Sequence, residues 1–208
     1  MLALWVISWV GVGYKVEEFE AFGVSSKERG ARTNEGLEII RRLWEGETLS
    51  FDGKYYTVSN ARLTPEPIQQ PRPPIWVGGF TPPALRRAAK YADGYIGVGP
   101  LKEAYDGYVT ALEKIGKPIS GVRLAGGYFW LIPSEDPEKT WDEAAEHVRY
   151  QINAYAEWSA KAGMPLFDHM PDVKALLESG MFQVVDAETC IQMIRDYAAQ
   201  TPLTHYYS

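Results

Sequence analysis

Residues 75–89, IWVGGFTPPALRRAA, have the composition of a turn that binds an anion. Gly78 and Gly79 lack a Cβ, so a ligand can approach the backbone closely there. Thr81 suits the N-cap of a following helix, and Pro82 suits its first position. We therefore predict a helix N-terminus whose free N–H groups, with the Thr81 hydroxyl, face a phosphate at the carboxyl end of a strand. A plain turn between a strand and a helix has the same composition, so that alternative stays open.

Charged and aromatic side chains elsewhere in the chain would help to hold such a ligand. Arg86 and Arg87 lie one to two turns into the predicted helix and would add positive charge. Trp130, near the end of a predicted strand, can pack on a cofactor or belong to the core. His169 lies in the loop FDHMPD, which can roof a pocket or cap the next helix. We name Trp130 and His169 as candidate substrate-binding residues.

The histidines do not indicate a metal site. The chain has three of them, His147, His169 and His205, and none has the spacing of a metal-ligand motif such as H-E-x-x-H. We therefore predict no metal.

Composition excludes several classes of protein. The formal net charge is −6 and no block of like charge stands out, so no nucleic-acid partner is expected. The single cysteine, Cys190, excludes an internal disulfide and favours a reducing compartment. The apolar segment MLALWVISWVGVGY is too short to span a membrane and lacks the basic start of a signal peptide. We expect a cytoplasmic protein with no membrane partner.

Apolar periodicity and turn residues predict strands and helices in alternation. Capping boxes are predicted at Ser25 with Glu28 and at Thr140 with Glu143. Asp52-Gly53 predicts a β-hairpin, and residues 64–74 predict an extended, proline-rich connector. The predicted strands are 3–12, taken as buried, 75–77, 95–98, 123–132 and 203–207. The predicted helices follow Ser25 and cover 82–92, 101–115, a long segment from about 137, 171–179, and a segment capped by Asp186 that ends near 200.

Alternation at this spacing predicts an α/β fold with a parallel sheet. A dinucleotide-binding sheet would need a third glycine after Gly11-Val12-Gly13, where the sequence has YKV instead. The other possibility is a (β/α)₈ barrel, which needs eight strands and typically about 250 residues. The five predicted strands would make only part of such a barrel.

Several segments, taken in order, resemble the bacterial-luciferase-like family of flavin- or deazaflavin-dependent oxidoreductases. The specific ones are ERG, LEIIRRLW, FDGKYY, PPIWVGG and ADGY. The resemblance implies a partial TIM (β/α)₈ barrel, comprising strands four to eight with a β-hairpin insertion. It implies one domain over residues 1–208 that lacks the first three βα units and ends within strand eight.

The resemblance also implies a cofactor, which is FMN or the deazaflavin coenzyme F-420, and a small organic substrate. The cofactor phosphate would rest on the loop after strand five, and the turn after strand four would flank the cofactor. A homodimer is expected, because an incomplete barrel leaves open sheet edges. The cofactor-binding residues implied are Gly11, Gly13, Tyr14, Gly78, Gly79, Phe80 and Thr81.

Three functions remain open from the sequence. The first is an oxidoreductase that transfers hydride or inserts one oxygen atom. The second is a non-catalytic flavin-binding protein or a truncated, inactive homologue. The third is an unrelated barrel that binds a sugar phosphate, which few carboxylates at strand ends support. No residue is predicted to be catalytic, because the cofactor carries the redox step in such enzymes.

Overall fold

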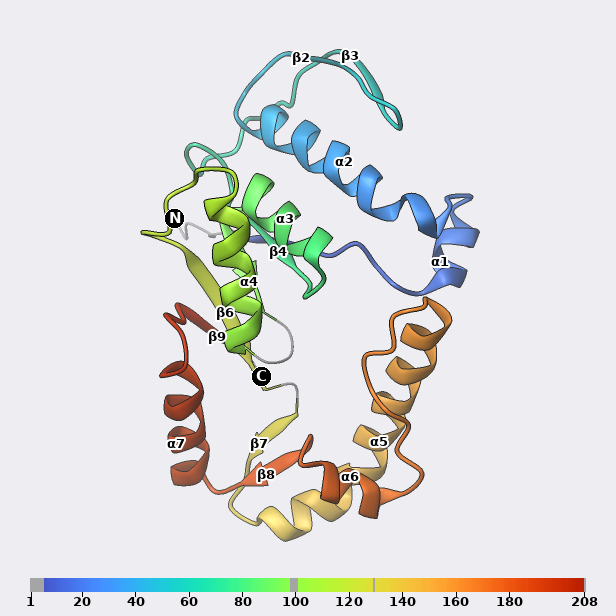
Figure 1. Ribbon diagram of the computed structural model, residues 1–208, viewed down its shortest axis with the longest axis vertical. Coiled ribbons are helices and arrows are strands. Elements are labelled where there is room, and N and C mark those ends of the chain that lie inside the picture. The colour runs from blue at the N-terminus through green and yellow to red at the C-terminus, as the bar shows by residue number, and fades with distance from the viewer. Residues whose placement is uncertain (1–5, 98–100, 129, 208) are drawn as a thin grey trace. The chain divides into compact units, whose positions relative to one another are not determined.

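The computed structural model describes residues 6–97, 101–128 and 130–207 (Figure 1). The chain forms two compact units, neither of which is one continuous segment. Unit 1 comprises Met1–Val12 and Lys27–Ala125, and unit 2 comprises Gly13–Ser26 and Gly126–Ser208.

Unit 1 is built on a parallel sheet with the strand order β1-β4-β5-β6. Ser8 lies opposite Ile75, and Trp76 lies opposite Gly94. The core of the sheet is apolar, since Ile75, Trp76, Val77, Tyr95 and Leu124 are all buried. Because the strands are parallel, their carboxyl ends meet at one edge. The strands are β1 (Ser8–Val10), β4 (Ile75–Gly78), β5 (Gly94–Ile96) and β6 (Arg123–Gly127), the last of which leads into unit 2.

Three helices complete unit 1: α2 (Arg29–Trp44), α3 (Pro82–Tyr91) and α4 (Leu101–Glu113). Helix α3 follows the prediction closely, and Ala84, Leu85 and Ala88 on it are buried. The predicted helix begins with a 3₁₀ turn, η1 (Ser26–Glu28), directly after Ser25. It continues as α2, whose N-cap is Glu28, and no side chain caps that end of α2. The Glu28 carboxylate accepts a hydrogen bond from Arg32 Nε at 3.0 Å. The capping box at Ser25 with Glu28 stays a prediction.

The predicted hairpin is confirmed between β2 (Leu49–Asp52) and β3 (Thr57–Ala61), which pair antiparallel. The connector at residues 64–74 is confirmed as non-helical.

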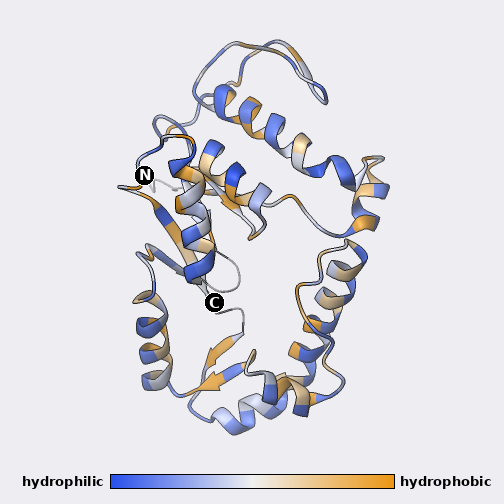
Figure 2. Ribbon diagram, in the orientation of Figure 1, coloured by the Kyte–Doolittle hydropathy of each residue, from blue (hydrophilic) through white to orange (hydrophobic). Residues whose placement is uncertain are grey.

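Unit 2 has a helical core of its own. Buried Ala145, Val148, Ile152, Met170, Leu176 and Phe182 form it. Figure 2 shows β7 and β8 as the most apolar strands at the foot of this unit. The elements are α1 (Val16–Ala21), β7 (Leu131–Pro133), α5 (Pro137–Lys161), α6 (Val173–Ser179), β8 (Gln183–Val185), α7 (Ala187–Ala198) and β9 (His205–Tyr207).

Two predictions that concern unit 2 are wrong. The strand predicted over 123–132 is two strands, because β6 ends at a glycine pair and β7 takes a different partner, β8. The capping box at Thr140 does not form. Asp136 caps α5 instead by accepting the Lys139 N–H at 3.2 Å, and Thr140 Oγ1 lies 2.7 Å from Ser134 Oγ.

The strand predicted over 3–12 is confirmed at Ser8–Val10, and residues 3–5 lie outside the described part. Its predicted burial is wrong at Trp9, which is 59% exposed. The observed class is α/β with a parallel sheet and helices. The partial TIM barrel and a single domain over 1–208 stay predictions. Among the described residues, no helix is long and apolar enough to cross a membrane.

Candidate cofactor-binding site

The candidate site in unit 1 is the loop between β4 and α3. Buried Ile75–Val77 anchor the strand, and Gly78 still pairs with Ile96 of β5. Gly79 then leaves the sheet with φ at +124°, a conformation that favours glycine. A Cβ added to Gly79 would lie 2.9 Å from the Ala84 Cβ, whereas one on Gly78 would make only ordinary contacts. The structure therefore requires glycine at position 79 but not at position 78.

A buried tyrosine fixes this loop. Tyr95 of β5 is fully buried, and its hydroxyl donates to the Gly79 carbonyl oxygen at 2.7 Å. Its ring packs against that of Tyr108 on α4, with 4.8 Å between centroids. Burial raises the pKa of Tyr108 to about 12. The loop thus rests on a dry aromatic layer within unit 1.

The predicted source of hydrogen-bond donors is wrong in part. Thr81 is the N-cap of α3 by backbone geometry, as predicted, but its side chain makes no capping bond. Pro82 and Pro83 have no N–H, and the Ala84 and Leu85 N–H groups both donate to the Thr81 carbonyl. The first turn of α3 therefore offers no free N–H to a ligand. The Phe80 and Thr81 N–H groups donate to no acceptor in the described chain. These two N–H groups, and not those of the helix, are the donors available to a ligand.

The two arginines of α3 have separate environments. Arg87 is buried, and it donates from Nε to Asn34 Oδ1 at 2.7 Å and from Nη2 to the Gly30 carbonyl at 3.1 Å. Burial lowers the pKa of Arg87 from its ordinary value, although a guanidinium stays charged. Arg87 thus joins α3 to α2. The prediction that Arg87 adds positive charge to an anion site is wrong. Arg86 is exposed.

The turn after β1 contributes residues to both units. Gly11 follows β1 in unit 1, and the register of Val10 opposite Val77 puts Gly11 at the same sheet edge as Gly78. Gly13 and Tyr14 belong to unit 2. Gly13 has φ at +75°, and a Cβ there would lie 3.0 Å from the Phe19 ring. Gly13 thus needs glycine for its own conformation.

Tyr14 belongs to an aromatic cluster in unit 2. Its ring lies 6.0 Å from Tyr155, which lies 5.7 Å from Trp158 and 6.2 Å from Phe167. Lys15 Nζ lies 4.8 Å from the centre of the Trp158 ring. Burial is the largest cause that raises the pKa of Tyr14 to about 12. The charge of Tyr155 and a hydrogen bond with it raise this pKa further.

The two candidate substrate residues each have a relation to Phe167. Trp130 packs on Phe167 with 5.7 Å between ring centroids, and its Nε1 donates to Gln151 at 2.9 Å. His169 is exposed and lines a hollow of about 610 Å³ with Phe167 and residues of α5. The other lining residues are Tyr150, Asn153, Ala154, Ala156, Glu157, Trp158, Ala160 and Asp168. The structure therefore gathers Tyr14, Trp130 and His169 around one aromatic cluster.

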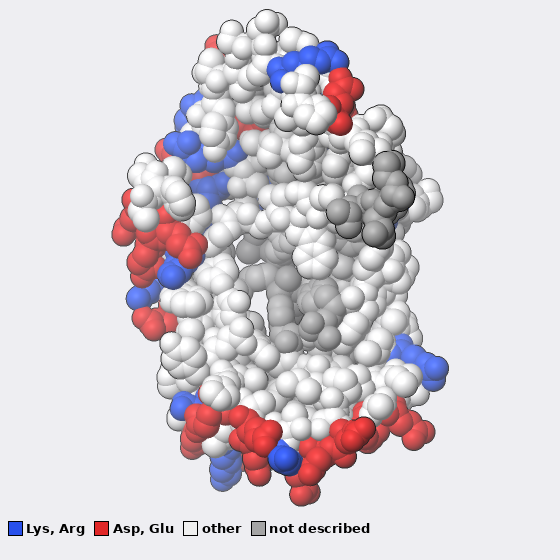
Figure 3. All heavy atoms as spheres, turned by 180° about the vertical axis from the view of Figure 1, so that it is seen from behind, with Lys and Arg blue, Asp and Glu red and all other residues white. Residues whose placement is uncertain are grey.

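Acidic side chains gather at the lower edge of the view in Figure 3, which is the end of unit 2 where α5 begins. No group of three His, Cys, Asp or Glu residues that could hold a metal ion occurs among the described residues.

Sequence reasoning missed Tyr95 and Asn153. Both Asn153 side-chain atoms bind the Met170 backbone, with Nδ2 donating to the carbonyl at 2.9 Å and Oδ1 accepting the N–H at 2.7 Å. This pair fixes the segment that carries Phe167 and His169. The signal for Tyr95 was present in ADGY, but its contact with Gly79 depends on a strand register that the sequence does not reveal.

The model of the luciferase-like monooxygenase family matches residues 6–202. The chain belongs to this family. An uncharacterized protein of Mycobacterium tuberculosis (strain ATCC 25618 / H37Rv) is 36% identical over 106 residues, which are 51% of this chain and 36% of that protein. A protein of Mycobacterium bovis (strain ATCC BAA-935 / AF2122/97), also uncharacterized, matches equally. The luciferase-like chain thus aligns with about a third of each relative's length.

Solved structures show the same fold at low identity. Monooxygenase RslO1 from Streptomyces bottropensis has a TM-score of 0.75 at 21% identity, covering 96% of this chain and 60% of its own. An F-420-dependent secondary alcohol dehydrogenase, solved with an F-420–acetone adduct, has 0.69 at 21%, covering 95% and 62%. The oxygenating constituent of 3,6-diketocamphane monooxygenase from Pseudomonas putida, solved with FMN, has 0.67 at 17%, covering 96% and 62%.

Proposed function

We propose that this luciferase-like chain is part of an oxidoreductase that uses FMN or F-420 to transform a small organic substrate. The reaction would be hydride transfer or insertion of one oxygen atom. The observation that carries the proposal is the loop of Gly79, Phe80 and Thr81. It presents two N–H groups and one hydroxyl, without partners in the described chain, at the carboxyl end of a buried strand.

These donors suit a phosphate ester. Backbone N–H groups that converge at a strand-to-helix turn bind oxyanions, because they supply positive dipoles without a side chain to reorganise. The fixed φ of Gly79 and the buried strand before it hold the turn in place before any ligand arrives. FMN and F-420 both carry a phosphate, and one solved neighbour holds each of them.

The cofactor would supply the electrons, and the chain's residues would bind and orient it. Gly78, Gly79, Phe80 and Thr81 would hold the phosphate, with Gly11 at the same sheet edge. In unit 2, Tyr14 is proposed as a cofactor contact, and Trp130 and His169 are proposed as substrate contacts. His169 lines the hollow of about 610 Å³ in that unit. Cytoplasmic location and a homodimer stay predictions.

The test is a fluorescence titration of the purified chain with FMN and, separately, with F-420. Gly79→Ala introduces a Cβ at 2.9 Å from the Ala84 Cβ, whereas Gly36→Ala on α2 meets nothing within 4 Å. We expect the wild type and Gly36→Ala to bind one cofactor, and Gly79→Ala to bind it at least about tenfold more weakly. Far-UV circular dichroism should be the same for all three proteins.

The outcomes separate the remaining functions. Failure of both cofactors to bind to folded protein would contradict the proposal. Binding of FMN with consumption of oxygen in the presence of a reductant would support a monooxygenase. Binding of F-420 without oxygen consumption would support hydride transfer, because the deazaflavin does not activate oxygen. Binding without any turnover would support a non-catalytic flavin-binding protein.

A further inference from the structure

We propose that Tyr95 is a positioning residue for the cofactor phosphate: its hydroxyl holds the Gly79–Phe80 peptide so that the Phe80 N–H points at the phosphate. This inference rests on the proposed function. Tyr95 is buried, and its effect on phosphate binding would pass through the Gly79–Phe80 peptide.

The strand register explains how Tyr95 reaches the loop. Tyr95 lies opposite Val77, and Gly79 comes two residues after Val77, one residue beyond the end of β4. Two residues of strand span roughly 6.6 Å, which is close to the length of a tyrosine side chain. The hydroxyl therefore meets the Gly79 carbonyl at 2.7 Å, just beyond the end of the strand.

Peptide geometry converts that contact into an orientation. The Gly79 C=O and the Phe80 N–H belong to one planar peptide, and in the trans form they point in opposite directions. Because the carbonyl is turned inward to Tyr95, the Phe80 N–H is turned away from the core. Gly79 can adopt this orientation because its φ of +124° is accessible to glycine.

Phenylalanine at position 95 removes the hydroxyl and keeps the aromatic ring. Tyr95 is fully buried and its ring packs on Tyr108, so phenylalanine at position 95 would fill the same space. Tyr108→Phe removes a second hydroxyl from the same buried pair, on a side chain that makes no hydrogen bond to the loop. The two substitutions are therefore matched in chemistry and in burial.

The experiment measures the Kd of FMN and of riboflavin, which lacks the phosphate, for wild type, Tyr95→Phe and Tyr108→Phe. If F-420 is the cofactor, F-420 and its phosphate-free ribityl deazaflavin replace them. We expect Tyr95→Phe to weaken binding of the phosphorylated form about tenfold and to leave the phosphate-free form unchanged. Tyr108→Phe should bind both forms as the wild type does.

Equal Kd values for FMN in the wild type and Tyr95→Phe would overturn the inference while leaving the proposed function intact. A similar loss for FMN and riboflavin in Tyr95→Phe would also overturn it, because that result would mean a general structural role. A wild type that binds FMN no better than riboflavin would refute the phosphate loop itself, and with it the role of Tyr95.

Discussion

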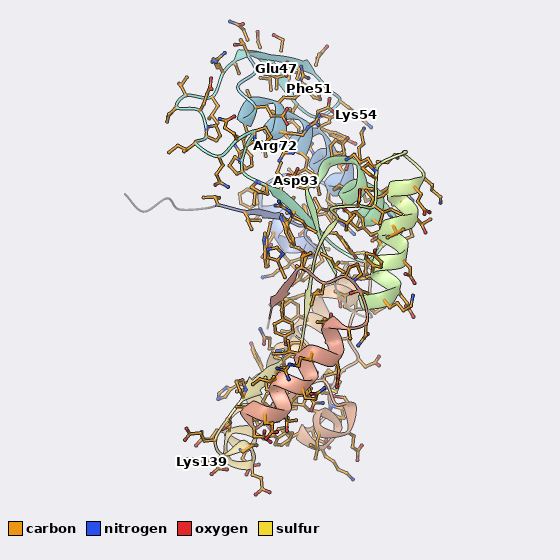
Figure 4. The ribbon with its side chains drawn as sticks, turned by 90° about the vertical axis from the view of Figure 1, so that its left-hand side faces the viewer. Glu47, Phe51, Lys54, Arg72, Asp93 and Lys139 are labelled. Atoms are coloured by element: carbon orange, nitrogen blue, oxygen red, sulfur yellow. The ribbon has the colours of Figure 1, made fainter. Side chains whose placement is uncertain are left out.

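Arg72 lies against Asp93, and this pair joins the connector before β4 to the turn before β5 (Figure 4). Arg72 Nη2 donates to Asp93 Oδ1 at 3.0 Å, and its Nε donates to Glu45 at 3.1 Å. Asp93 Oδ2 also accepts the Ile75 N–H at 2.8 Å. Asp93 therefore fixes the start of β4 at Ile75, and Arg72, whose side chain is only 8% exposed, holds Asp93.

Arg72→Ala should destabilise the chain by about 1–3 kcal/mol, because it leaves Asp93 without its cation in a partly buried site. Urea unfolding followed by circular dichroism measures the change. The matched control is Arg62→Ala just before the connector, where Arg62 pairs with Glu66 and is 49% exposed. That loss should stay below about 1 kcal/mol. Equal losses would show that burial of Arg72 is not what gives the pair its effect.

Glu35 holds the turn of the hairpin to α2. Its carboxylate accepts N–H groups from Lys54 and Tyr55 at 2.9 Å and from Tyr56 at 3.1 Å. Glu35→Ala removes all three acceptors, so amide hydrogen exchange at residues 54–56 should accelerate roughly tenfold or more. Glu38→Ala on the same helix should leave these rates unchanged. Unchanged rates in Glu35→Ala would mean that other contacts hold the turn.

Asn153 controls the segment that carries His169. Asn153→Ala removes both bonds to the Met170 backbone and should cost about 1–3 kcal/mol, because Met170 is buried. With three histidines in the chain, a proton NMR spectrum of their rings can follow each of them. The His169 signal should shift or broaden, and those of His147 and His205 should not. A spectrum that changes at all three positions would indicate general unfolding instead.

The raised pKa of Tyr14 predicts a pH dependence. The phenol titrates near 12 in the folded chain and at its ordinary value of 10.0 in the unfolded chain. The unfolded state therefore loses this proton first, and the Tyr14 contribution to stability falls as pH rises from about 10 to about 12. The difference in phenolate absorbance between wild type and Tyr14→Phe should show a transition near 12. Tyr155→Phe should lower that value without bringing it to 10, since burial is the larger cause. A Tyr14 transition at 10 would contradict the described packing.

The sequence predicts the ends of helices and strands where local residue types determine them. Prolines and glycines mark the ends of β4 and α3, and Asp186 caps α7 as expected by accepting the Thr189 N–H at 2.8 Å. Choices between competing local partners were not predictable: Asp136 and Thr140 are both good caps, and the chain uses Asp136. Strand β8 has three residues, too few for periodicity to detect. The prediction of free N–H groups in the first turn of α3 is wrong, although Pro83, which has no N–H, is visible in the sequence.

The parallel pairing of β1 with β4 sets an order of events during synthesis. Ser8 lies opposite Ile75, so β1 leaves the ribosome before α2, the hairpin and the connector, and its neighbour in the sheet follows only after them. Translation proceeds at about 5–20 residues per second, so the backbone N–H and C=O groups of β1 wait several seconds for those of β4. A pause before residue 75 would lengthen this interval, and codon choice across the connector would therefore change its length.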